Sequence, residues 1–207
     1  MYSSPTPHKV ERHGLIIPHA EAFVDPADGV EKYYVGRRNV HHLEASIIDQ
    51  IAGSHFAKPD VLIAITRGGE FPFYTLSEVF PHALHGHLPI KRYKNAVEGH
   101  NAYVGNINWA PSTDGTVRPP ETGSTVLLGS VARVLVIEEI YDTGKSHGLF
   151  MAVVRKALPS ICSNQVFQIK TAAFFRKASS VAKPDFCAIE VPNNPETGKS
   201  PWIVFHW

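Results

Sequence analysis

Hydrophobic residues in this chain fall into two patterns that alternate along the sequence. Short, mostly apolar runs, which are typical of buried strands, lie at residues 61–65, 88–93, 134–137, 166–175, 186–191 and 202–205. Helical spacing of apolar residues predicts a helix from Asn39, a candidate N-cap, to about Gly53, and another from Leu149 to about Pro159. Pro72 suits the first turn of a helix that reaches about Phe80. This alternation predicts an α/β fold with a doubly wound, mostly parallel sheet.

Two segments lack either pattern. Residues 1–36 contain several prolines and little periodicity, and we expect an irregular N-terminal extension packed on a domain that spans 37–207. Residues 94–129 are rich in Gly, Pro, Asn and Asp, with a possible short strand at 125–128. A connection of this length without regular structure is usually either disordered or a functional lid. We therefore treat 94–129 as an insertion or mobile loop.

The stretch from Arg133 to Gly148 carries the clearest chemical signal. Its apolar strand runs into Glu138 and Glu139, and after two further residues comes the turn Asp142-Thr143-Gly144-Lys145-Ser146, which opens a helix. Backbone N–H groups of such a turn, with the positive end of a helix behind them, favour a phosphate. The paired carboxylates can accept hydrogen bonds from sugar hydroxyls or hold Mg²⁺ through water. Together these features suit a phosphorylated sugar.

This stretch also fits two other interpretations. Asp142 alone is better explained as a helix cap, and two glutamates can form a solvated turn. Gly144-Lys145-Ser146 also matches the end of a Walker A phosphate loop. That motif requires a glycine five positions before Gly144, where this chain has Glu139, whose charge would repel phosphates.

A second glycine-containing turn follows the strand at 61–65. It reads Thr66-Arg67-Gly68-Gly69, and its N–H groups and the Arg67 guanidinium could bind a diphosphate. On its own the turn is equally consistent with a tight connection that carries a surface arginine. Its place one βα unit before the central stretch favours a role in the same site.

Composition limits the remaining possibilities. The chain has 207 residues, about one domain, with 43% hydrophobic residues and a net charge of +1. We therefore expect no nucleic-acid or membrane partner. Cys162 and Cys187, far apart in apolar surroundings, are expected to be reduced, which favours a cytoplasmic location. The histidines, densest at 41–42 and 82–87, are expected on the surface rather than around zinc.

The central stretch resembles the PRPP-binding motif of type I phosphoribosyltransferases: an apolar strand, two acidic residues, two apolar residues, then D-T-G-x-[ST]. Asp142, at the start of the loop, resembles the Asp found at that position in the 6-oxopurine (hypoxanthine, guanine, xanthine) branch of the family. The resemblance covers about residues 38–207. It implies the type I fold, with a small hood built from the C-terminal segment 186–207 and the mobile loop 94–129.

The resemblance also implies roles for individual residues. Glu138 and Glu139 would contact the PRPP ribose and Mg²⁺, Asp142 to Ser146 the 5′-phosphate, and Asp142 would be the catalytic base. Pyrophosphate would be bound by Arg67, Gly68, Gly69 and Lys91, the last within a K-x-Y that opens the mobile loop. Lys177 would bind the purine, with Arg176 as the substitute if the register is off by one. Trp202 would stack on the base or, equally, anchor the final strand.

The implied reaction transfers the 5-phosphoribosyl group from PRPP to a 6-oxopurine, in purine salvage, with Mg²⁺ as cofactor. It gives a nucleoside monophosphate and pyrophosphate. The alternatives are a non-catalytic regulator that senses PRPP and a phosphoribosyltransferase that acts on another heterocycle. Family likeness also suggests a homodimer.

Overall fold

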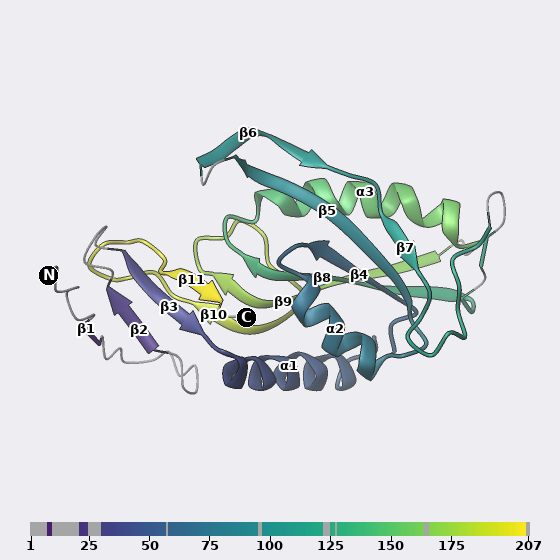
Figure 1. Cartoon of the computed structure of the whole chain (residues 1–207), viewed down its shortest axis with the longest axis horizontal. Helices are drawn as coiled ribbons and strands as arrows, with labels where there is room; N and C mark the ends of the chain where they lie inside the picture. Colours follow the sequence, from purple (N-terminus) through teal and green to yellow (C-terminus); the bar gives the residue numbers. More distant parts are fainter. Residues whose placement is uncertain are drawn as a thin grey trace, which may run out of the picture.

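The computed structural model describes residues 8–9, 21–24, 30–56, 58–94, 97–121, 125–126, 128–163 and 166–205. Its centre is a seven-stranded sheet with helices on both faces (Figure 1). The sheet follows the order β10 (Phe186–Val191), β9 (Val166–Lys177), β8 (Val131–Tyr141), β4 (Val61–Thr66), β5 (Leu84–Lys94) and β6 (Val97–Val104), with β7 (Asn108–Ala110) also paired to β5. The helices are α1 (Arg37–Ala52), α2 (Glu70–Val79) and α3 (Lys145–Ile161).

Alternating side chains of the central strands fill two separate cores. Leu62 and Leu135 belong to the core that also contains residues of α1 and α2, whereas Val61 and Val134 belong to the core beneath α3. Successive residues of a strand point to opposite faces, so a strand covered on both sides must be apolar throughout. The continuous apolar runs at 61–65 and 134–137 are therefore explained by helices on both faces, and the predicted doubly wound fold is confirmed.

The strand order places a crevice at one point of the sheet. Strands β10, β9, β8, β4 and β5 are parallel neighbours, and the chain moves from β4 first to β5 and later to β8 on the opposite side. The connections after β4 and β8 therefore turn to opposite faces of the sheet. In open α/β sheets, ligands bind outside the carboxyl ends of the strands at such a switch point. Both glycine-containing turns found in the sequence lie there.

A second, smaller sheet contains segments from both parts of the chain that flank the central domain. Its order is β1 (His8–Lys9), β2 (Glu21–Val24), β3 (Glu31–Val35) and β11 (Trp202–Phe205). Strands β3 and β11 are parallel, and Trp202 is in register with Lys32. The prediction of an irregular 1–36 segment is therefore wrong for these strands: a β-strand from the N-terminal part completes the hood sheet, which the C-terminal segment does not form alone.

The segment 94–129 is also more regular than predicted. Strand β6 and strand β7 both pair antiparallel with β5, which begins at Leu84, earlier than the predicted strand at 88–93. Of the predicted strand at 125–128, the described residues form an isolated bridge between Val126 and Cys162. Strand β6 follows β5 as a hairpin, in which Lys94 pairs with Val97, and its polar, glycine-containing sequence hid it, whereas β7 pairs with the more distant start of β5.

The helix boundaries differ slightly from the predicted ones. Helix α1 begins at Arg37 after Gly36, and Asn39 is the third helical residue, where its side chain accepts a hydrogen bond from the Gly36 N–H at 2.9 Å. Asn39 thus caps the helix from within the first turn rather than from the N-cap position. Helix α3 continues past Pro159 to Ile161, and the Cys162 N–H donates to the Leu158 carbonyl at 2.8 Å. A proline this close to the end removes one hydrogen bond without ending the helix.

The histidines of β5 are not all at the surface. His85 is buried, and its ring packs edge-on against Phe73 with centroids 4.9 Å apart; His87 contacts the same ring at 4.8 Å. The expectation of surface positions is therefore wrong for His85, because β5 lies inside the sheet and not at its margin. Within the described parts of the chain, the helices are too short or too polar to cross a membrane.

Candidate active site

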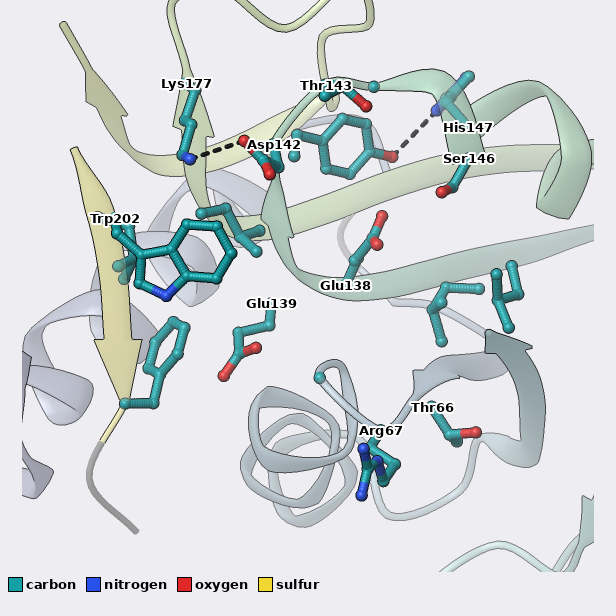
Figure 2. A pocket seen from close by; sticks show the side chains of 18 residues that line it. Thr66, Arg67, Glu138, Glu139, Asp142, Thr143, Ser146, His147, Lys177 and Trp202 are labelled. Atoms are coloured by element: carbon teal, nitrogen blue, oxygen red, sulfur yellow. Dashed lines mark hydrogen bonds and ion pairs between the residues drawn. The ribbon is translucent and has the colours of Figure 1, made fainter. Parts of the chain in front are cut away.

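A cavity of about 310 Å³ opens at the carboxyl ends of β4 and β8, beside the hood strand β11 (Figure 2). Its walls come from five parts of the chain: the end of β4 with the turn that follows, β5, the end of β8 with the loop that follows, the end of β9, and β11. The polar residues that line it are Thr66, Arg67, Glu138, Glu139, Tyr141, Asp142, Thr143, Ser146, His147 and Lys177. Most of the residues singled out in the sequence are thereby brought to one place.

The loop after β8 requires a glycine at its centre. Gly144 has a φ of +73°, and a Cβ atom there would lie 2.5 Å from the Ala182 nitrogen and 2.6 Å from Ser180 Oγ. The Val181 N–H donates to the Thr143 carbonyl at 3.1 Å, so the chain around 180–182 packs behind the loop. Thr143, Gly144 and Ser146 line the cavity, at the N-terminus of α3. Lys145, from the same motif, is exposed and does not line the cavity.

Glu138 and Glu139 are both strongly perturbed by their place in the cavity. Burial first, and the nearby Asp142 second, raise the pKa of Glu138 to about 8. Burial and the charge of Glu138 raise the pKa of Glu139 to about 8. Figure 2 shows both side chains in the space bounded by Trp202, the Asp142 loop and the Thr66–Arg67 turn. Two carboxyl groups held this way are stabilised in the charged form by a cation or by hydroxyl donors.

The two glycines of the turn after β4, both predicted to bind pyrophosphate, lie in different surroundings. Arg67 and Gly68 line the cavity, and a Cβ on Gly68 would come within 2.9 Å of Glu139 Oε2, so the two loops touch at this point. Gly69 does not line the cavity. Its N–H donates to the Ile65 carbonyl at 2.8 Å, and a Cβ there would lie 2.3 Å from the Ile137 carbonyl oxygen. Gly69 therefore allows close packing of the turn against β8 and is not placed to bind a diphosphate.

One further feature of this turn had no sequence signal. The Thr66–Arg67 peptide bond is cis although Arg67 is not a proline.

Lys91, the remaining residue assigned to pyrophosphate, lies in β5 opposite Tyr103, and its side chain is outside the described residues. Its neighbour Ile90 lines the cavity.

Lys177 at the end of β9 faces the loop after β8. Its Nζ lies 2.7 Å from Asp142 Oδ1 and 5.4 Å from the centre of the Trp202 ring, and Lys177 is buried whereas Trp202 remains half exposed (Figure 2). The alternative residue Arg176 points elsewhere, since it pairs with Glu190 at 2.7 Å and donates to the carbonyls of Ser180 and Ala182. Lys177, and not Arg176, is therefore the residue that places a positive charge in this part of the cavity.

Several lining residues were missed by sequence reasoning. Tyr141 directly precedes the Asp142–Ser146 loop and His147 directly follows it, and the motif assigns neither residue a role. A hydroxyl and an imidazole beside such a loop are nevertheless a signal in themselves. The Tyr141 hydroxyl lies 3.1 Å from His147 Nδ1, and burial raises the pKa of Tyr141 above its usual range. Phe205 and Ile90 come from distant strands, and only the fold could have placed them here.

In chemical terms the cavity has two ends. One end offers a backbone loop with a helix N-terminus, two carboxylates and Arg67, which suits a sugar that carries phosphate groups. The other end offers a flat indole face with the Lys177–Asp142 pair beside it, which suits a planar ring with polar edges. An arrangement of this kind can hold two reactants with their reacting atoms in contact.

The phosphoribosyl transferase domain family matches residues 32–207. The chain belongs to this phosphoribosyltransferase family. The match begins within β3, so the family's domain includes the strand that pairs with β11 and begins before residue 37.

Solved phosphoribosyltransferase structures share this fold. A purine phosphoribosyltransferase from Pyrococcus horikoshii is 22% identical, with a TM-score of 0.58, and the match covers 85% of this chain and 93% of that one. The xanthine-guanine-hypoxanthine phosphoribosyltransferase of Helicobacter pylori is 18% identical, with a TM-score of 0.55 and the same coverage. No curated protein matches the sequence.

Proposed function

We propose that this phosphoribosyltransferase transfers the 5-phosphoribosyl group of PRPP to a nitrogen of a 6-oxopurine base, in purine salvage, and releases pyrophosphate. The observation that carries the proposal is the single cavity that joins the Asp142–Ser146 loop and the Glu138–Glu139 pair to Lys177 and Trp202. Two solved structures that share the fold are named as purine enzymes, which supports the same acceptor.

Mg²⁺ is the cofactor we propose, because the residues present fit it. Glu138 and Glu139 are two half-buried carboxyl groups whose raised pKa values would fall beside a cation. A magnesium site usually has one or two protein carboxylates and is completed by substrate oxygens and water. The metal would supply charge neutralisation for the pyrophosphate that leaves.

The base end orients the purine. The Trp202 ring stacks on the base, and the Lys177 ammonium donates to the 6-oxo oxygen. Asp142 lies 2.7 Å from Lys177, so the carboxylate and the ammonium can contact neighbouring edges of one ring. Asp142 accepts the proton of the purine nitrogen N7 as the new bond to the sugar forms.

The sugar-phosphate end holds PRPP in place. Backbone amides of the loop that contains Thr143 and Gly144 bind the 5′-phosphate, and the guanidinium of Arg67 binds the pyrophosphate group that departs. As that group leaves, the sugar becomes an oxocarbenium-like cation, which Glu138 and Glu139 stabilise from their place in the cavity.

Water must be kept from this cation. We propose that the segment 94–129, which starts at the last residue of β5 and contains β6, covers the cavity during reaction. Ile90, in the same strand β5, lies in the cavity wall and supports this proposal. A homodimer in the cytoplasm is the remaining part of the proposal. Light scattering coupled to size exclusion tests the dimer by its mass.

The decisive experiment incubates the protein with PRPP, Mg²⁺ and a panel of bases: hypoxanthine, guanine, xanthine, adenine and orotate. We expect pyrophosphate release and a nucleoside monophosphate with one or more of the three 6-oxopurines. Binding of PRPP without turnover on any base would favour the non-catalytic PRPP sensor. Turnover confined to adenine or orotate would show that the acceptor is another heterocycle.

A further inference from the structure

His147 and Tyr141 form a polar pair at the phosphate end of the cavity. Both residues line it together with Thr143, Gly144 and Ser146. His147 belongs to the first turn of α3, directly after the loop, and Tyr141 is the last residue of β8, directly before Asp142. The pair therefore brackets the loop that is proposed to bind the 5′-phosphate.

The imidazole of His147 is held in one orientation by its neighbours. Its Nδ1 lies 3.1 Å from the Tyr141 hydroxyl (Figure 2), and its ring packs edge-on against Phe150 with centroids 5.1 Å apart. Tyr141 is itself fixed, since it is 2% exposed and its ring contacts Phe150 with centroids 6.3 Å apart. A buried tyrosine hydroxyl requires a hydrogen-bond partner, and here His147 is one.

The hydrogen bond to Tyr141 leaves one imidazole nitrogen for another partner. Whichever of the two groups donates, Nδ1 is engaged, and no hydrogen bond joins His147 Nε2 to any residue that the structure describes. Nε2 can carry a proton and donate it to an anionic oxygen. A ring that lines the cavity in a fixed orientation, with one nitrogen still unused, is suited to a ligand.

We infer that His147 contacts the 5′-phosphate of the phosphoribosyl substrate through Nε2, and that Tyr141 positions it through Nδ1. The inference rests on the proposed function, because it assigns two more residues to the phosphate end of that site. It goes beyond the loop amides, since it adds a side-chain donor next to them. His147 is the contacting residue, and Tyr141 is a positioning residue.

Two substitutions of His147 separate its two nitrogens. The amide nitrogen of asparagine reaches the place of Nδ1, whereas that of glutamine reaches the place of Nε2. We expect His147→Asn to weaken binding of the matching nucleoside 5′-monophosphate about tenfold, as for the loss of one hydrogen bond to a charged group. His147→Gln is expected to stay within about threefold of the wild type, and Tyr141→Phe to fall between the two variants.

The measurements are the dissociation constant of the nucleoside monophosphate, by calorimetry, and the KM values for PRPP and for the purine. We expect the nucleotide affinity and the KM for PRPP to change while the KM for the purine stays constant, which also shows that the variant pocket is folded. Unchanged nucleotide affinity in His147→Asn, or equal changes in both KM values, would overturn the inference. A wild-type protein that binds neither PRPP nor any nucleotide would instead refute the proposed function.

Discussion

The two ends of the cavity are built in opposite ways. The sugar-phosphate end comes mostly from one continuous stretch, the end of β8 and the loop to α3, and is fixed by close backbone contacts such as those around Gly144. The base end is assembled from Lys177 on β9 and Trp202 on β11, and Trp202 remains half exposed. We therefore expect the phosphate end to be rigid and, under the proposed function, the base end to be adjustable and to carry the choice of acceptor.

The largest expected effect tests the residue that joins the two ends. Asp142→Asn keeps the loop and its helix, so PRPP should still bind, whereas turnover should fall about 100- to 10,000-fold because the proton acceptor is lost. Steady-state kinetics and PRPP binding by calorimetry measure the two effects. Turnover like that of the wild type would remove Asp142 as the base.

The rigidity of the phosphate end can be tested with a pair of glycines. Gly144→Ala forces a side chain onto a left-handed backbone and against the Ala182 nitrogen, which should cost about 2 kcal/mol or more in stability or move the loop. We expect PRPP affinity to fall at least about thirtyfold, in line with that energy. Calorimetric titration with PRPP and thermal unfolding give the two quantities.

Gly148→Ala is the matched control in the same helix. A Cβ on Gly148 meets no atom within 4 Å, and alanine is the better helix former, so stability should rise by up to about 1 kcal/mol without loss of PRPP affinity. Equal losses in the two variants would mean that the loop does not depend on its close packing.

The base end is tested by Lys177→Met, which keeps the length of the side chain and removes its charge. The KM for the purine should rise about tenfold or more, as for a lost charge-assisted hydrogen bond, while the KM for PRPP changes less. Arg176→Met is the comparison variant: Arg176 does not line the cavity, but it donates to the carbonyls of Ser180 and Ala182 behind the Gly144 loop, so its loss should act on the KM for PRPP rather than on that for the purine. Equal increases in both KM values for Lys177→Met would argue against a role in binding the base.

The smallest effect concerns the carboxyl pair. Their folded-state pKa values of about 8 lie above the usual value near 4.5, so the ligand-free folded protein holds protons that the unfolded chain has lost. Stability should therefore fall as pH rises from about 5 to about 8, and then level off. Glu138→Gln should remove about half of this decline, as measured by Tm in thermal scans across that pH range. An identical slope in the variant would show that Glu138 titrates normally.

The sequence predicts the sugar-phosphate end of the cavity better than the base end, for a physical reason. The motif from Glu138 to Ser146 is local, so spacing alone places its groups at a strand end and a helix start, and the continuous apolar runs predict the central parallel strands. The hood depends on pairing between β3 and β11, and β6 and β7 depend on β5. The β3–β11 and β5–β7 pairs join separate parts of the chain, whereas β6 follows β5 directly as a hairpin but has a mixed polar sequence without a periodic trace.

The two glycines after β4 show the same limit on a smaller scale. Gly68 and Gly69 read alike in the sequence, yet one faces Glu139 and the other packs against the carbonyl oxygens of Ile65 and Ile137. Only the approach of β8 to the turn distinguishes them. Tyr141 and His147 were overlooked because the motif defines their neighbours, although both side chains reach the cavity.

The parallel pairing of β3 with β11 has a consequence for how the protein is made. Strand β3 leaves the ribosome before any strand of the central sheet, but its partner is complete only when residues 202–205 have been synthesised. Closing so long a loop costs entropy that short connections do not require. The nascent chain can therefore complete the loop around Gly144, which packs against residues 180–182, before it completes the β3–β11 pair that carries Trp202.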